Sequence, residues 1–171
     1  MTTRSFLSAK FLSVLGTLTL MTVGTVAFTA RDARANHRAD CPKHLKQRSA
    51  EETIRQHLAL MEAGDLDTAM CDYAEDAVVV LPNQEVTGLD NIRAGLSGVG
   101  TLLGGVLPQV QTLTATSSVV MITFTAIGSP CTIPDGSDTY IVERGQIVTQ
   151  TVHDTFHSAP GQTCPVAAPG Q

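Results

Sequence analysis

The chain has 171 residues, with 11 Lys plus Arg against 16 Asp plus Glu and a formal net charge of −5 at pH 7. This balance excludes nucleic acid and anionic lipid surfaces as expected partners, because binding to phosphate groups needs clustered cations. A chain of this length is enough for one domain with its own hydrophobic core.

The first 35 residues have the pattern of an export signal. Arg4 and Lys10 give a positive start, residues 11–28 carry no charge, and Ala33-Arg34-Ala35 is an Ala-x-Ala cleavage site. We therefore expect residues 1–35 to be removed by cleavage near Ala35, and the mature protein to be secreted or periplasmic. The alternative is an uncleaved membrane anchor, since the uncharged stretch approaches the length that spans a bilayer.

Residues 36–48 are polar and charged without periodicity, and we expect them to form an extended lead-in. This segment and the helix expected after it contain His37, His44 and His57. Their spacing matches no metal motif, which favours solvated histidines and predicts no metal site.

Two short helices are expected next. Ser49 and Glu52 form a capping box that starts the first helix, and an apolar stripe at helical spacing follows. Gly64 can end this helix, and Asp65 can cap a second helix whose apolar positions run to Tyr73. Residues 77–81 then form an apolar run rich in valine, which indicates a buried strand. A third helix is marked by Leu89, Ile92 and Leu96, and a glycine-rich connection follows it.

The second half of the chain has patterns that predict β-strands. Residues 109–116 alternate loosely, residues 119–127 are dense in β-branched side chains, and residues 128–136 form a turn. Residues 138–143 and 146–156 then form a hairpin through Gly145. Helices followed by strands predict an α+β fold, with residues 158–171 as a tail that has no core pattern. The expected core consists of Ile54, Leu58, Met61, Leu66, Met70, Val79, Ile92, Leu96, Val120, Ile122, Phe124, Val148 and Val152.

The wording "EAGDLDTAMCDYAEDAVVVLP" followed by "VTGLDNIRAGL" resembles the SnoaL-like branch of the nuclear transport factor 2-like superfamily. The resemblance covers roughly residues 49–156 and places the domain at 49–157. It implies a curved, mainly antiparallel sheet wrapped around three N-terminal helices, which makes a cone with an apolar pocket. It also implies that catalysis, where members of the family carry it out, uses pocket acids without a cofactor.

The last strand departs from the family pattern. Polyketide-cyclase-like members often read "G-K-I-V-E-H-W-D" here, with a pocket-facing His and Asp as acid–base residues. Gln150 and Val152 occupy those two positions, and neither exchanges a proton near neutral pH. Because side chains alternate along a strand, Val148, Gln150, Val152 and Asp154 are expected to share the pocket face.

Few groups remain for chemistry. Asp154 is the candidate base if it is desolvated, but a place at the wet end of the strand is the alternative. Tyr73 could donate a hydrogen bond into the pocket, although at helical spacing it also fits a core position. Asp135 and Asp138 flank a turn glycine and are interpreted as turn residues. The expected ligand-binding residues are Tyr73, Phe124, Gln150, Val152 and Asp154.

Two function classes follow. The missing dyad favours an exported module that binds a small apolar ligand or serves as an accessory or dimerisation domain, with a homodimer left open. The alternative is a cofactor-independent isomerase, cyclase or dehydratase that acts on a small carbonyl compound through Asp154 and Tyr73.

The four cysteines are expected to form two disulfides, since an even count in an exported chain favours pairing. The second helix returns toward the lead-in, which favours Cys41 with Cys71. The turn before the hairpin lies at the same sheet edge as the end of the last strand, which favours Cys131 with Cys164. The alternative is that Cys71 is a buried free thiol.

Overall fold

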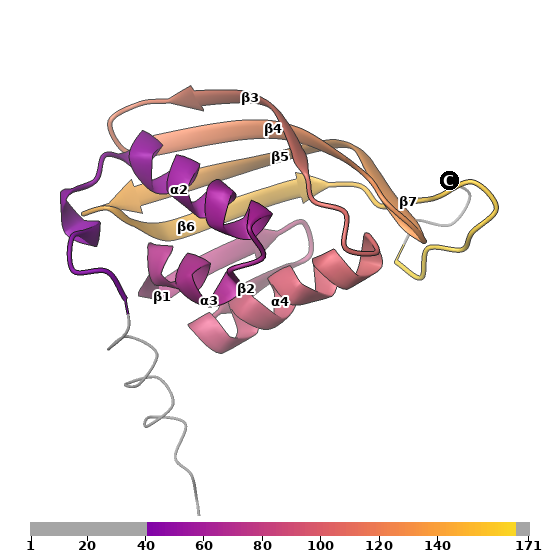
Figure 1. Cartoon of the computed structure of the whole chain (residues 1–171), viewed down its shortest axis with the longest axis horizontal. Coiled ribbons are helices and arrows are strands. Elements are labelled where there is room, and N and C mark those ends of the chain that lie inside the picture. The colour runs from indigo at the N-terminus through magenta and orange to yellow at the C-terminus, as the bar shows by residue number, and fades with distance from the viewer. Residues whose placement is uncertain (1–40, 167–171) are drawn as a thin grey trace, which may run out of the picture.

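The computed structural model describes residues 41–166 and has the expected α+β architecture (Figure 1). The predicted export signal and the start of the lead-in, including His37, lie outside the described residues. No helix within residues 41–166 is long and apolar enough to cross a membrane. In chain order the elements are η1 (Leu45–Gln47), α2 (Ala50–Glu62), α3 (Leu66–Ala69), η2 (Met70–Asp72), β1 (Tyr73–Leu81), β2 (Gln84–Thr87), α4 (Leu89–Leu102), β3 (Gln109–Ala115), β4 (Val119–Ile127), β5 (Cys131–Glu143), β6 (Gln146–Asp154) and β7 (His157–Ser158).

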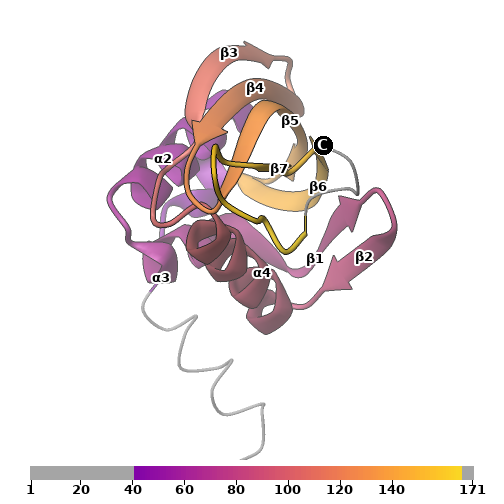
Figure 2. The same cartoon turned by 90° about the vertical axis from the view of Figure 1, so that its right-hand side faces the viewer.

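One seven-stranded sheet with the order β2-β1-β6-β5-β4-β3 forms the body, and β7 pairs with β5 off this path. β1 runs parallel to β6, and the other pairs of the described sheet are antiparallel. The sheet curls strongly, as Figure 2 shows. α2 packs against β4, β5 and β6, while α4 packs against β1 and β2. The cone expected from the family resemblance is therefore present.

The first helix begins as the sequence predicts. The Ser49 hydroxyl accepts from the Glu52 backbone N–H at 3.2 Å, and the Glu52 carboxylate accepts from the Ser49 N–H at 2.7 Å. This reciprocal pair satisfies two N–H groups that the helix itself leaves open. Asp65 likewise accepts from the Thr68 N–H at 3.0 Å and caps α3.

Two helix boundaries differ from the prediction. The second helix does not reach Tyr73, because α3 tightens into η2 and Tyr73 is the first residue of β1. The third helix does not end at Leu96 but continues to Leu102, and its apolar stripe extends through Val99 to the buried Leu103. That extended stripe is packed against the core. The packing outweighs the low helix propensity of the glycines that lie between the apolar residues.

β5 begins at Cys131, so the predicted turn over residues 128–136 is too long. The register pairs Phe124 with Gly136 and Ala126 with Ile133, which leaves two residues of β5 opposite one residue of β4. The turn-like Pro134 and Asp135 therefore lie in a β-bulge inside a strand. Gly136 is needed there because a Cβ would lie 2.6 Å from the Phe124 ring.

A second bulge corrects part of the predicted core. Val148 is skipped by the pairing of β6 with both β5 and β1, so Ile147 takes the inner position and is fully buried. Val148 is half-buried and lies outside the core cluster, as does Met61. Leu58, Leu66, Leu96 and Val152 are half-buried residues packed against the core, and the other predicted core residues are buried.

Both predicted disulfides are present. Cys41 pairs with Cys71 at a Cα–Cα distance of 5.6 Å, and Cys131 pairs with Cys164 at 4.8 Å. The residues after β6 are held by more than the second bridge, because β7 pairs with the start of β5 and Ala159 is buried.

Candidate functional site

The inner face of the sheet carries a hydrogen-bonded group that we call the inner polar cluster: Tyr73, Asp138, Tyr140 and Gln150. Tyr140 on β5 lies opposite Gln150 on β6, and Tyr73 enters from the start of β1. The Asp138 Oδ2 atom accepts from the Tyr140 hydroxyl at 3.0 Å and from the Gln150 side-chain amide at 2.9 Å. The Tyr73 hydroxyl donates to the Gln150 side-chain oxygen. Three strands thus fix one carboxylate in place.

Asp138 contributes the only carboxyl group of this cluster. The residue is only 8 % exposed, and its Oδ1 atom has no hydrogen-bond partner. Burial raises the pKa of Asp138 to about 6, against the opposing effect of the two hydrogen bonds from Tyr140 and Gln150. The nearby Asp154 raises this pKa further. A carboxyl group with such a pKa can both take and release a proton near neutral pH.

The phenol groups of Tyr73 and Tyr140 remain protonated and act as hydrogen-bond donors. Burial raises the pKa of both phenols well above the usual value, and the charge of Asp138 adds to the effect. They therefore hold the carboxylate and the amide as hydrogen-bond donors rather than as bases.

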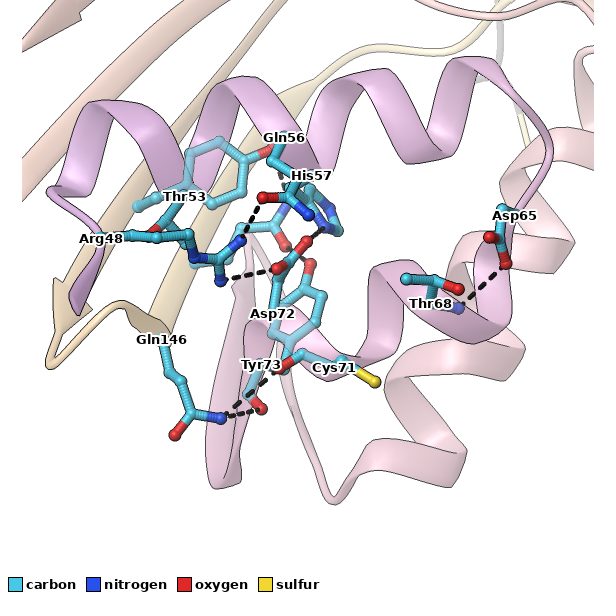
Figure 3. Close-up of polar contacts among 12 residues, drawn as sticks. Arg48, Thr53, Gln56, His57, Asp65, Thr68, Cys71, Asp72, Tyr73 and Gln146 are labelled. Atoms are coloured by element: carbon cyan, nitrogen blue, oxygen red, sulfur yellow. Dashed lines mark hydrogen bonds and ion pairs between the residues drawn. The ribbon is translucent and has the colours of Figure 1, made fainter. Parts of the chain in front are cut away.

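A second buried polar group, which we call the strap anchor (Arg48, His57 and Asp72), lies next to Tyr73 (Figure 3). Asp72 is 1 % exposed and forms an ion pair with the Arg48 guanidinium at 2.7 Å. The other Asp72 oxygen lies 3.5 Å from His57 Nδ1, and neither of these two atoms has a hydrogen-bond partner. The His57 ring meets the ring of Tyr73 edge-on at 5.3 Å and that of Tyr140 at 6.3 Å between centroids. The strap anchor therefore contacts the inner polar cluster through aromatic edges.

The residues predicted from sequence fall in two places. Tyr73 and Gln150 belong to the inner polar cluster, and Phe124 is buried nearby on β4. Val152 and Asp154 lie further along β6, where the residues become half-buried. Burial raises the pKa of Asp154, partly offset by His153, yet Asp154 makes no side-chain hydrogen bond to the cluster among the described residues.

Several residues of the site escaped the sequence prediction. His57 is buried rather than solvated, and Asp138 is a buried residue in the middle of β5 rather than a residue that flanks a turn. Asp72 and Tyr140 were not singled out at all. The alternation of Asp138, Tyr140 and Val142 on one strand face was an available signal, but the bulge at Pro134 and Asp135 concealed where the strand starts.

No group of three or more His, Cys, Asp or Glu side chains within residues 41–166 is arranged to hold a metal ion.

Solved structures with the same fold show low sequence identity. A protein from Kribbella flavida is 20 % identical with a TM-score of 0.54, and the match covers 62 % of this chain and 86 % of that one. A putative polyketide cyclase from Sinorhizobium meliloti is 15 % identical with a TM-score of 0.52, covering 60 % and 94 %. SalBIII is an epoxide hydrolase/cyclase-like enzyme with a role in pyran ring formation in the polyether salinomycin. It is 17 % identical with a TM-score of 0.54, covering 61 % and 89 %.

No curated protein matches the chain. The family model described as the SnoaL-like domain matches residues 54–162, which include most of α2, the whole sheet and every residue of the inner polar cluster. The protein therefore belongs to the SnoaL-like domain family.

Proposed function

We propose that this protein is a cofactor-independent enzyme that moves a proton on a small carbonyl compound, as isomerases, cyclases and dehydratases do, with Asp138 as the acid–base residue. One observation carries the proposal: Asp138 is buried and fixed through Oδ2, while Oδ1 has no partner. An unpartnered buried oxygen is costly in a purely structural role.

The proposed step uses the ionised carboxylate. Asp138 Oδ1 takes a proton from the carbon next to the substrate carbonyl, and the electron pair of that C–H bond moves to the carbonyl oxygen. The protonated Asp138 then returns the proton to the same or another carbon of the substrate. Tyr140 and Gln150 hold the carboxylate oriented throughout, because both donate to Oδ2. The raised pKa of about 6 suits a group that must accept and release a proton in one cycle.

We place the proposed route to Asp138 along β6, where burial decreases toward the end of the strand. Gln150 is buried, whereas Val152, Asp154 and Phe156 further along the chain are half-buried. Asp138 is paired with Val152 in the sheet, which places the carboxylate beside this more open end. We infer that substrate enters there, with Asp154 at the entrance and Phe124 and Val152 against the apolar part of the substrate.

A ligand-binding role without chemistry is the second candidate. It is supported by Gln150 and Val152, which occupy the positions of the acid–base pair in polyketide-cyclase-like members and cannot exchange a proton near neutral pH. Binding in such a site serves an accessory module as well as an enzyme.

For either role, we propose that the protein is located outside the cytoplasm. The two disulfides are compatible with an extracellular location, since such bridges persist in oxidising compartments. Cleavage of the signal near Ala35 is part of this proposal, and the N-terminal sequence of the exported protein tests it.

Deuterium incorporation tests the proposed chemistry without knowledge of the natural product. Small ketones are incubated with the protein in D₂O, and proton NMR follows the loss of signal at the carbon next to the carbonyl. We expect Asp138→Asn to abolish exchange and Asp135→Asn, an exposed change on the same strand, to leave it intact. Exchange that survives Asp138→Asn would exclude Asp138 as the base. Ketone binding without exchange in the wild-type protein would favour the second candidate.

A further inference from the structure

A cleft lies beside the segment Cys41–Arg48, which we call the strap, and Tyr73 is the one member of the inner polar cluster among its lining residues. This cleft has a volume of about 250 Å³. Lys43, Leu45 and Lys46 of the strap contribute part of the lining, and Met70, Leu89 and Gln146 contribute to it from the body of the protein. The lining therefore combines two cations with an apolar surface.

The strap is held rigidly against the body of the protein. The Cys41–Cys71 disulfide fixes its first residue, and Arg48 at its end is ion-paired to Asp72 and donates to the Gly145 carbonyl at 2.9 Å. In the middle, Leu45 lies so close to Gly145 that a Cβ there would be 1.8 Å from the Leu45 carbonyl oxygen. The wall that carries the lysines is thus formed before any ligand arrives, which lowers the entropic cost of binding.

The residues that line the cleft from the body of the protein are fixed as well. The Gln146 side-chain amide donates to the backbone carbonyl of Tyr73 at 3.2 Å and lies 3.5 Å from that of Cys71, as Figure 3 shows. Met70, which also lines the cleft, is buried in the core. The two sides of the cleft therefore belong to one framework.

The charge of the cleft is opposite to that of the chain. Neither Lys43 nor Lys46 has an ion-pair partner within residues 41–166, although acids outnumber bases in this protein. A neighbouring cavity of about 200 Å³ shares Met70 and Leu89 and contains Asp90 and Arg93. Arg93 is already paired with Asp67, so the free positive charge lies at the strap end.

From these observations we propose that the strap cleft binds a small amphiphilic anion. Its carboxylate or similar head group lies between Lys43 and Lys46, and its short apolar part lies on Leu45, Met70 and Leu89. This site is separate from Asp138 and does not depend on the proposed proton transfer.

Hexanoate is a suitable probe, with hexan-1-ol as the uncharged control of equal chain length. Binding is measured by calorimetry and by the methyl NMR signals of the methionines. We expect hexanoate to shift the Met70 signal and not that of Met121, which lies exposed on β4 away from the cleft. Hexan-1-ol should bind at least about tenfold more weakly, a difference that corresponds to about 1.4 kcal/mol.

Substitution of the lysines tests the head-group contact. The double variant Lys43→Gln with Lys46→Gln should weaken hexanoate binding about tenfold, and Arg55→Gln, which removes a remote exposed cation on α2, should leave it unchanged. Equal binding of hexanoate and hexan-1-ol, a shift at Met121 but not Met70, or no binding at all would overturn the proposal.

Two further variants separate this site from the proposed active site. Asp138→Asn should bind hexanoate as the wild type does, whatever its effect on deuterium exchange. The double variant Cys41→Ser with Cys71→Ser should abolish hexanoate binding because it releases the strap. The matched variant Cys131→Ser with Cys164→Ser should leave hexanoate binding unchanged. Wild-type hexanoate binding in the first disulfide variant would contradict the role assigned to the strap.

Discussion

Two disulfides close similar spans of chain at the two ends of the molecule, but the surroundings of the bridges differ. Cys41–Cys71 spans 30 positions and secures the strap at one end, and Cys131–Cys164 spans 33 and secures the tail at the other (Figure 1). At the strap end the bridge lies next to the buried ion pair between Arg48 and Asp72. At the tail end the neighbours are backbone contacts, with the Ala159 N–H donating to the Pro130 carbonyl at 2.9 Å.

This difference indicates which end can influence the site. Backbone pairing at the tail end satisfies its own donors and acceptors and contacts no member of the inner polar cluster directly. At the strap end, the contacts continue from Arg48 through Asp72 to His57 and then to the tyrosine rings. A disturbance of the strap should therefore reach the inner polar cluster, whereas a disturbance of the tail should not.

The largest effect is expected from Arg48→Gln. The change leaves the buried Asp72 carboxylate without its cation, and breaking a buried pair in this way typically costs about 3–5 kcal/mol. The matched control is Arg55→Gln, which breaks the exposed pair with Glu51 and should cost less than about 1 kcal/mol. Urea unfolding of the three proteins measures both values. Similar small losses for the two variants would mean that Asp72 is neutral or solvated.

The disulfides come next. Replacing either pair with serine should lower the free energy of unfolding by on the order of 3–4 kcal/mol, since the closed loops are nearly equal in length. The variants should differ in the interior: only the loss of Cys41–Cys71 should shift the ring NMR signals of His57 and Tyr73 in the folded protein. Equal shifts in both variants would contradict the asymmetry between the two ends.

The sequence predicted the covalent links at the two ends better than it predicted the interior. The disulfide pairing, the capping box at Ser49 and the order of helices and strands followed from local chemistry and topology. These features depend on residues close in sequence or on antiparallel neighbours, so a pattern in the sequence suffices to predict them.

The inner polar cluster could be predicted only in part. Tyr73 and Gln150 were identified, but Asp138, although placed at the start of a strand, was interpreted as a turn residue because it follows Pro134, Asp135 and Gly136. A bulge inside a strand uses the same residue types as a turn, and only the pairing partner distinguishes them. His57 was misjudged for a similar reason, because its burial depends on Asp72 and on rings contributed by β1 and β5, which are distant in sequence.

An effect of opposite sign is expected for Asp138→Asn. The folded pKa of Asp138 is about 6, above the ordinary carboxyl value of 3.8, so the folded protein binds the proton more tightly than the unfolded chain. The corresponding stability is fully present below pH 4 and is lost as the pH rises through 6. Asparagine carries no charge and can still accept from Tyr140 and Gln150. It should therefore stabilise the protein at pH 7 by on the order of 2–3 kcal/mol.

Thermal unfolding at several pH values checks this result. The difference between Asp138→Asn and wild type should shrink toward zero below pH 4, while Asp135→Asn should show no such pH dependence. A constant difference across pH 4 to 7 would mean that Asp138 is not a raised-pKa carboxyl group in the folded protein.

The smallest effect is expected from strain at two glycines, one at each end. Gly145 and Gly161 both have positive φ, 69° and 72°, where an alanine costs roughly 1–2 kcal/mol. Around Gly161 no atom lies within 4 Å of an added Cβ, so Gly161→Ala should cost only that strain. At Gly145 the Cβ would also collide with the Leu45 backbone, so Gly145→Ala must in addition push the strap away. Gly145→Ala should therefore cost more than Gly161→Ala, and it alone should weaken hexanoate binding and shift the His57 signals. Equal costs with an unchanged strap would show that Leu45 moves freely, and the strap could not then carry the preformed wall of the cleft.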